Sequence, residues 1–79
     1  MTSNPPTDES LRQLVAQVMG VTPAEVTDDF GAATSPAWTS LKQLMLISQV
    51  ESRYGVMFSN QEVAELTSYR RFAELTRSR

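Results

Sequence analysis

Apolar residues in this chain recur every three or four positions in four separate segments, which is the spacing of one helix face. The strict alternation of apolar and polar residues that marks a half-buried strand is absent from the sequence, and no segment repeats another. The pattern therefore predicts an all-α fold. A length of 79 residues suffices for a single small domain.

Two long helices are delimited by candidate caps and by glycines. Thr7 can cap the first helix, and Gly20 can end it in the left-handed conformation that glycine adopts at helix C-termini. The second helix begins at Thr39 or Ser40 and ends before Gly55. The residues expected to face the core are Leu11, Leu14, Val15, Val18 and Met19 in the first helix, and Leu41, Leu44, Ile47, Val50 and Tyr54 in the second, with Leu46 in a second inward row.

The segment between these helices is expected to contain a short turn within residues 21–26 and then a loop over residues 27–37, because Pro23 suits the first position of a helical turn. Val26 and Phe30 are expected to enter the core, and Asp28 and Asp29 to face solvent. After Gly55, residues 56–58 form an apolar connector that should insert between helices. Its Met57, like Met19 earlier in the chain, is expected in the core.

The last third of the chain predicts two further helices. Ser59 and Glu62 have the spacing of a capping box, which opens a short helix through Leu66. Thr67 or Ser68 caps a final helix, with Tyr69, Phe72 and Leu75 inward and Arg70, Arg71, Arg77 and Arg79 outside or at its end. The predicted fold is an antiparallel bundle of three main helices and one short helix, with a long loop between the first two long helices. Residues 7–79 form this single domain, and residues 1–6 are expected to be a flexible leader.

The composition excludes several classes of protein. The chain has no cysteine and no histidine, which excludes disulfides, a Ser-His-Asp triad, and thiolate or imidazole metal sites. Asp28 and Asp29 alone are weak grounds for a metal site. We therefore expect no catalytic or metal-binding residues, and no enzyme. A net charge of −2 argues against nucleic-acid binding, and no apolar run could span a bilayer. The N-terminus lacks signal-peptide features, so a cytoplasmic protein is expected. We also expect a monomer.

Ser40 lies where the second long helix begins. A side chain there is surrounded by unpaired backbone N–H groups and by the positive end of the helix dipole, so the position suits a phosphate, bound or covalently attached. Taken alone, a serine before an apolar helix is more often a simple N-cap. The rest of the pattern decides between these two interpretations.

The whole pattern resembles the acyl carrier protein family, in which Asp-Ser-Leu opens the second helix. Ser40-Leu41, the apolar positions Leu44, Leu46, Ile47 and Val50, then Glu51 and Tyr54-Gly55 match that helix in register. The resemblance covers roughly residues 8–76 and also includes Thr22-Pro23, Asp28-Asp29-Phe30, Phe58-Ser59 and Leu66-Thr67-Ser68-Tyr69. It implies that Ser40, flanked by Thr39 and Leu41, carries covalent 4′-phosphopantetheine derived from coenzyme A.

Two departures from the family pattern are informative. Thr39 stands where most members have aspartate, so a negative charge is missing next to the serine. The helix after Ser40 has Lys42, Gln43, Met45 and Gln49 where fatty-acid carriers usually have several glutamates. Together with Trp38, these features resemble dedicated stand-alone carriers of specialised polyketide or nonribosomal peptide pathways.

The resemblance also implies partners. They are a phosphopantetheinyl transferase, an acyl-loading ligase or acyltransferase, and a downstream synthase or transferase, with no nucleic acid and no membrane. Met45 is expected on the surface, and the residues expected to dock partners are Trp38, Lys42, Met45 and Gln49. Trp38 could equally cover the core. An apolar cleft for the acyl chain is expected between Leu14, Leu41, Leu44, Ile47, Phe58, Val63 and Phe72. Two alternatives stay open at this point: an aminoacyl or peptidyl carrier, and an unmodified interaction module, which Thr39 favours.

Overall fold

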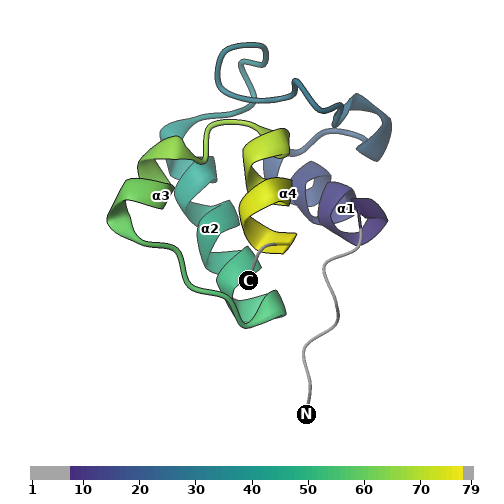
Figure 1. Ribbon diagram of the computed structural model, residues 1–79. Helices are drawn as coiled ribbons and strands as arrows, with labels where there is room; N and C mark the ends of the chain where they lie inside the picture. The colour runs from purple at the N-terminus through teal and green to yellow at the C-terminus, as the bar shows by residue number, and fades with distance from the viewer. Residues whose placement is uncertain (1–7, 78–79) are drawn as a thin grey trace.

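Four α-helices and one short 3-10 turn account for the regular structure of the computed structural model, which describes residues 8–77 (Figure 1). The elements are α1 (Asp8–Met19), η1 (Pro23–Glu25), α2 (Ser40–Tyr54), α3 (Asn60–Glu65) and α4 (Tyr69–Arg77). Within this part of the chain there is no strand, only an isolated bridge between Gly31 and Ser68. The predicted all-α fold is confirmed. Thr7, Arg79 and the leader expected over residues 1–6 lie outside the described residues.

The helix ends follow from local capping chemistry. Gly20 and Gly55 have left-handed backbones, with φ of 74° and 66°, and Gly55 donates its N–H to the Glu51 carbonyl at 3.0 Å. Ser59 and Glu62 form the predicted capping box at the start of α3. Of the two residues predicted to cap α4, Ser68 does so, since its hydroxyl accepts from the Arg71 N–H at 3.3 Å.

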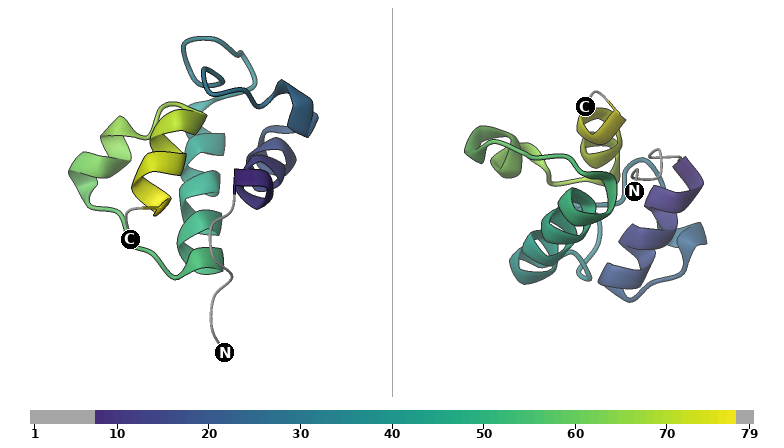
Figure 2. Two further views of the ribbon diagram at one scale, coloured as in Figure 1. Left: turned by 45° about the vertical axis from the view of Figure 1, so that its right-hand side comes forward. Right: turned by 90° about the horizontal axis from the view of Figure 1, so that it is seen from below.

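Helices α1 and α2 lie side by side and run in opposite directions (Figure 2). Ser10, near the start of α1, shares a hydrogen bond of 2.8 Å with the Tyr54 hydroxyl at the end of α2. At the other end, the Lys42 ammonium donates to the Met19 carbonyl at 3.1 Å. The long loop before α2 arches over this second end of the bundle (Figure 1), so the start of α2 lies where the loop meets the helices.

The core is formed by one cluster of apolar side chains from all the elements except η1 and α3, together with residues of the loops. Trp38 and Phe72 have ring centroids 5.8 Å apart, and Phe30 and Phe58 flank this pair at 5.7 Å from Trp38 and 6.3 Å from Phe72. Such edge and tilted arrangements are those that aromatic rings favour. The buried positions of Val26 and Phe30 confirm the prediction that the loop enters the core.

The predicted orientation of α2 is wrong in part. Leu41 and Leu44 are 69% and 58% exposed, whereas Leu46 is fully buried. Leu41 and Val50 are nine residues apart, which at about 100° per residue puts them on opposite sides of the helix, so they cannot both face the core. The structure buries the side that carries Leu46, Ile47, Val50 and Tyr54. The apolar cleft expected partly from Leu41 and Leu44 therefore does not form from those residues.

Met57 is also misplaced by the sequence analysis. It is 76% exposed, while Val56 and Phe58 on either side of it are each 8% exposed. Residues 56–58 are not helical, and outside a helix successive side chains can point in opposite directions, as they do in a strand. Because Val56 and Phe58 enter the core, Met57 points to solvent. Met19, by contrast, is buried as predicted.

Candidate functional site

Ser40 is the first residue of α2, and Thr39 is the N-cap. The Thr39 backbone is extended, with φ −95° and ψ 164°, and its hydroxyl accepts from the Lys42 N–H at 3.2 Å. Threonine therefore caps the helix at the position where most members of the family that the sequence resembles have aspartate. Because Thr39 caps the helix, the Ser40 side chain is left for another role. Ser40 is exposed, and its hydroxyl makes no hydrogen bond within residues 8–77.

The start of α2 retains positive character. The first turn contains no acidic residue. The Gln43 N–H is bonded to the Thr39 carbonyl at 2.9 Å, but the N–H groups of Ser40 and Leu41 have no acceptor within the described chain. Unpaired amides and the positive end of the helix dipole stabilise negative charge placed beside them. A phosphodiester on the Ser40 oxygen fits this environment.

Trp38 lies behind this site as a core residue. It is 5% exposed, as the alternative that it covers the core predicts, and so little of its surface is available to the partners for which it was predicted. Its ring N–H donates to the Gln43 side-chain carbonyl at 2.9 Å, and the Gln43 amide donates to the Val63 carbonyl at 3.3 Å. Gln43 thus links the residues before Ser40 to α3. This link joins residues 38, 43 and 63, and no local sequence pattern indicates it.

The loop that leads to Ser40 is fastened to the junction of α3 and α4. Ala32 donates to the Thr67 carbonyl at 2.9 Å, and Tyr69 donates to the Phe30 carbonyl at 2.8 Å. Between these bonds, Gly31 lies so close to the backbone of Thr67 that a Cβ at position 31 would be 2.3 Å from the Thr67 carbonyl oxygen. Only glycine permits this contact. The sequence analysis did not identify Gly31, because its partner is distant in the chain.

Exposed apolar side chains follow Ser40 along α2 and form an apolar surface. It consists of Leu41, Leu44 and Met45, which are 69%, 58% and 49% exposed. Gln49 extends it, and the exposure predicted for Met45 is confirmed. Lys42 is half-buried beside it, with its ammonium directed at the Met19 carbonyl. Solvent-facing apolar side chains of this size are typical of an interaction surface.

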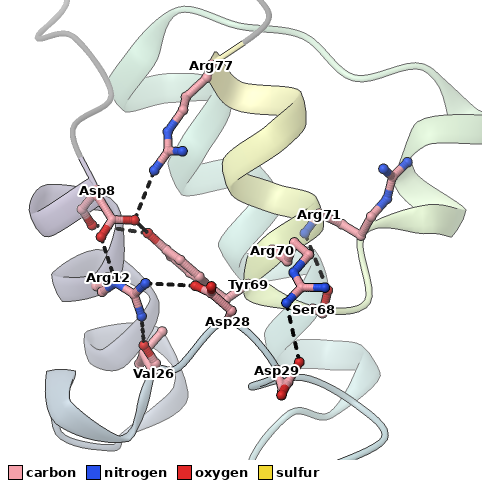
Figure 3. Close-up of polar contacts among 10 residues, drawn as sticks. All are labelled: Asp8, Arg12, Val26, Asp28, Asp29, Ser68, Tyr69, Arg70, Arg71 and Arg77. Carbon is pink, nitrogen blue, oxygen red and sulfur yellow. Dashed lines mark hydrogen bonds and ion pairs between the residues drawn. The ribbon is translucent and has the colours of Figure 1, made fainter.

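A cluster of polar side chains, away from Ser40, joins α1, the loop and α4 (Figure 3). The Asp8 carboxylate accepts from the Tyr69 hydroxyl at 2.5 Å and from Arg12 and Arg77 at 2.9 Å each. The hydrogen bond from Tyr69, followed by that from Arg12, lowers the pKa of Asp8. Burial, followed by the hydrogen bond to Asp8, raises the pKa of Tyr69. The cluster contains no group poised for chemistry near neutral pH, so we assign it to stability.

Both loop aspartates are paired with arginines. Asp28 contacts the Arg12 guanidinium at 2.8 Å, and Asp29 contacts Arg70 at 3.7 Å. Both carboxylates are exposed, as predicted. Arg12 also donates to the Val26 carbonyl and lies 4.4 Å from the centre of the Tyr69 ring. These contacts tie the loop to α1 and α4 (Figure 3).

Similarity to a curated protein identifies the family of this chain. No family model matches the chain. The "Polyketide-8 synthase acyl carrier protein 2" of Streptomyces avermitilis is 37% identical over 71 residues, which cover 90% of this chain and 82% of that protein. The chain belongs to the acyl carrier protein family. Membership in this family confirms the resemblance identified from the sequence. Among residues 8–77, no helix of this acyl carrier protein is both long and apolar enough to cross a membrane.

Proposed function

We propose that this protein carries an acyl intermediate as a thioester on 4′-phosphopantetheine attached to Ser40, in a polyketide or related specialised biosynthetic pathway. The observation that supports the attachment most strongly is the exposed Ser40 hydroxyl, free of hydrogen bonds within residues 8–77, at the uncompensated positive end of α2. The printed name of the Streptomyces avermitilis relative supports the class of pathway.

The chain's own residues have separate roles in this proposal. Thr39 caps the helix and leaves Ser40 exposed, and the unpaired Ser40 and Leu41 amides would stabilise the phosphate of an attached prosthetic group. The prosthetic group would supply the thiol, which a chain without cysteine lacks. In this proposal the protein acts as a carrier, and its partners catalyse the making and breaking of bonds.

The partners proposed are a phosphopantetheinyl transferase, an enzyme that loads the acyl group, and a synthase or transferase that consumes it. The surface proposed to receive them is the exposed side of α2, with Met45 and Gln49 among the residues predicted for docking. Leu41 and Leu44 join this surface because of their observed exposure. Lys42 lies at its edge, with its charge directed toward the Met19 carbonyl.

Intact-protein mass spectrometry tests the attachment site. Incubation with coenzyme A and a broad-specificity transferase should add one phosphopantetheine to the wild type and none to Ser40→Ala. The matched control is Ser48→Ala, which removes another exposed hydroxyl of α2 and should leave modification unchanged. Helical circular dichroism should be nearly the same for all three proteins, because Thr39 rather than Ser40 caps the helix.

Two outcomes would contradict this proposal. Modification of the Ser40→Ala variant would move the site elsewhere. A wild type that is never modified would instead favour an unmodified interaction module, the alternative suggested by Thr39, because the aspartate usual at that position is absent.

A further inference from the structure

A groove of about 240 Å³ lies between α1 and α2, on the side of α2 that faces α1. Its walls come from both helices, and the lining residues are Leu14, Gln17 and Val18 of α1 and Met45, Gln49 and Arg53 of α2. The apolar members, together with exposed Leu41 and Leu44 nearby, suit a branched or aromatic side chain from another molecule. Methionine adapts its shape to such a contact.

The charge of this groove is distinctive. Its lining includes one cation, Arg53, and no carboxylate. Every other arginine within residues 8–77 contacts at least one carboxylate: Arg12, Arg70, Arg71 and Arg77 all form ion pairs. Arg53 has no such partner in the described chain, although the protein as a whole has a net charge of −2. The groove is therefore a positive, apolar site on a protein of opposite net charge.

We propose that the groove binds an acidic amphipathic segment of a partner protein. An apolar side chain of that segment enters between Val18 and Met45, and a carboxylate pairs with Arg53. Charge complementarity is the argument for this occupant, because a basic segment would meet Arg53 with no compensating carboxylate in the groove. Lys42 adds little to the attraction, since its ammonium already donates to the Met19 carbonyl.

This inference rests on the docking role proposed above for the exposed side of α2, because Met45 and Gln49 also line the groove, and it adds the chemistry of the partner segment. The groove faces α1 and contains neither Ser40 nor Thr39, so binding there does not require a prosthetic group. The Ser40→Ala variant should bind the segment as the wild type does. Failure of the attachment experiment and failure of this binding experiment are therefore separate results.

The test is a titration of ¹⁵N-labelled protein with two synthetic peptides. Both are helical and leucine-faced, of about 15 residues, the length at which isolated helices begin to be stable. One carries glutamates beside the leucines, and its twin carries lysines at the same positions. The acidic peptide should shift the amide signals of Gln17, Val18, Met45, Gln49 and Arg53. Arg53→Glu should weaken its binding about fivefold and should favour the lysine twin, because reversing one exposed charge pair changes affinity modestly.

The matched control is Arg70→Glu, which changes the net charge equally but lies on α4, outside the groove. It should leave acidic-peptide binding within about twofold of the wild type, since its charge lies far from the bound carboxylate. Met45→Glu should weaken binding by placing a carboxylate in the groove. The proposal is overturned if Arg53→Glu and Arg70→Glu weaken binding equally, if the shifted amides lie elsewhere, or if the protein pairs with a second copy through this groove.

Discussion

Two leucines of α2, separated by a single residue, differ completely in environment. Leu46 is fully buried, whereas Leu44 is 58% exposed. Truncating a buried leucine removes apolar contacts and leaves a cavity, so Leu46→Ala should lower the free energy of unfolding by about 2–5 kcal/mol. Leu44→Ala should lower it by less than about 0.5 kcal/mol, as exposed substitutions usually do. Urea denaturation of both variants measures the difference. Equal losses would show that the helix is rotated relative to this structure.

Gly31 is the residue at which a single methyl group should be most disruptive. A Cβ at this position would lie 2.3 Å from the Thr67 oxygen and 2.7 Å from the Ser68 Cα, both of them backbone atoms. Gly31→Ala should therefore lower the free energy of unfolding by about 1–3 kcal/mol, the usual cost of overpacking. Thermal denaturation measures this loss.

Gly20 provides the comparison for that substitution. A Cβ there meets nothing within 4 Å, so Gly20→Ala pays only for its left-handed backbone, which has φ of 74°. In a residue with a Cβ, that strain costs about 1–2 kcal/mol. If Gly31→Ala were no more destabilising than Gly20→Ala, the loop would not be fastened to the α3–α4 junction in solution.

At the scale of the elements, local chemistry was sufficient to predict where helices begin and end. Thr39, Gly55 and the Ser59–Glu62 capping box act within a few residues, and the structure places them as predicted. The rotation of α2 about its axis was harder to predict from the sequence, because apolar residues occur on both sides of the helix. One side packs on the core, and the other is a proposed interaction surface. Periodicity alone cannot separate these two uses. Gly31 and Gln43 were missed because their partners, Ser68 and Val63, are distant in sequence.

The attachment of α1 to α4 through Asp8 predicts a pH dependence of stability. The pKa of Asp8 is lowered in the folded state, chiefly by the Tyr69 hydrogen bond. The carboxylate therefore stabilises the fold above its unfolded pKa of about 3.9, and this contribution is lost as the pH falls through the lower folded value. Asp8→Asn should lower the melting temperature at pH 7. The difference from the wild type should shrink as the pH falls below about 4 and should disappear below the lower folded pKa of Asp8.

Asp29→Asn is the control for this experiment. Asp29 is exposed and has one ion pair, to Arg70 at 3.7 Å. Exposed pairs of this kind contribute little, so the variant should melt close to the wild type at both pH values. A gap between Asp8→Asn and the wild type that persists unchanged into strong acid would contradict the assigned role of the Asp8 carboxylate.

At the scale of the whole molecule, a small bundle presents Ser40 at one end and an apolar face along α2. The molecule has a net charge of −2, but the first turn of α2 contains no acidic residue, and several carboxylates elsewhere are paired with arginines: Asp8, Asp28, Asp29, Glu65 and Glu74. If partners dock beside Ser40 as proposed, they meet exposed apolar side chains more than negative charge.

This arrangement predicts a weak dependence of partner recognition on salt. Exposed charges are screened beyond about 8 Å at physiological ionic strength, whereas apolar contact is not screened. The kcat/KM for modification of Ser40 by a broad-specificity transferase should therefore fall only slightly as NaCl is raised. Met45→Glu should lower it at every salt concentration, and Lys42→Glu should have a smaller effect, because the Lys42 ammonium is directed toward the Met19 carbonyl.

Thr39→Asp provides the positive comparison, because it restores the negative charge that transferases adapted to acidic carriers recognise. With such an enzyme, Thr39→Asp should raise kcat/KM at low salt and make its decline with salt steeper. A steep decline for the wild type, together with no response to Met45→Glu, would instead assign docking to the arginine-bearing surface of α4, around Arg70 and Arg71.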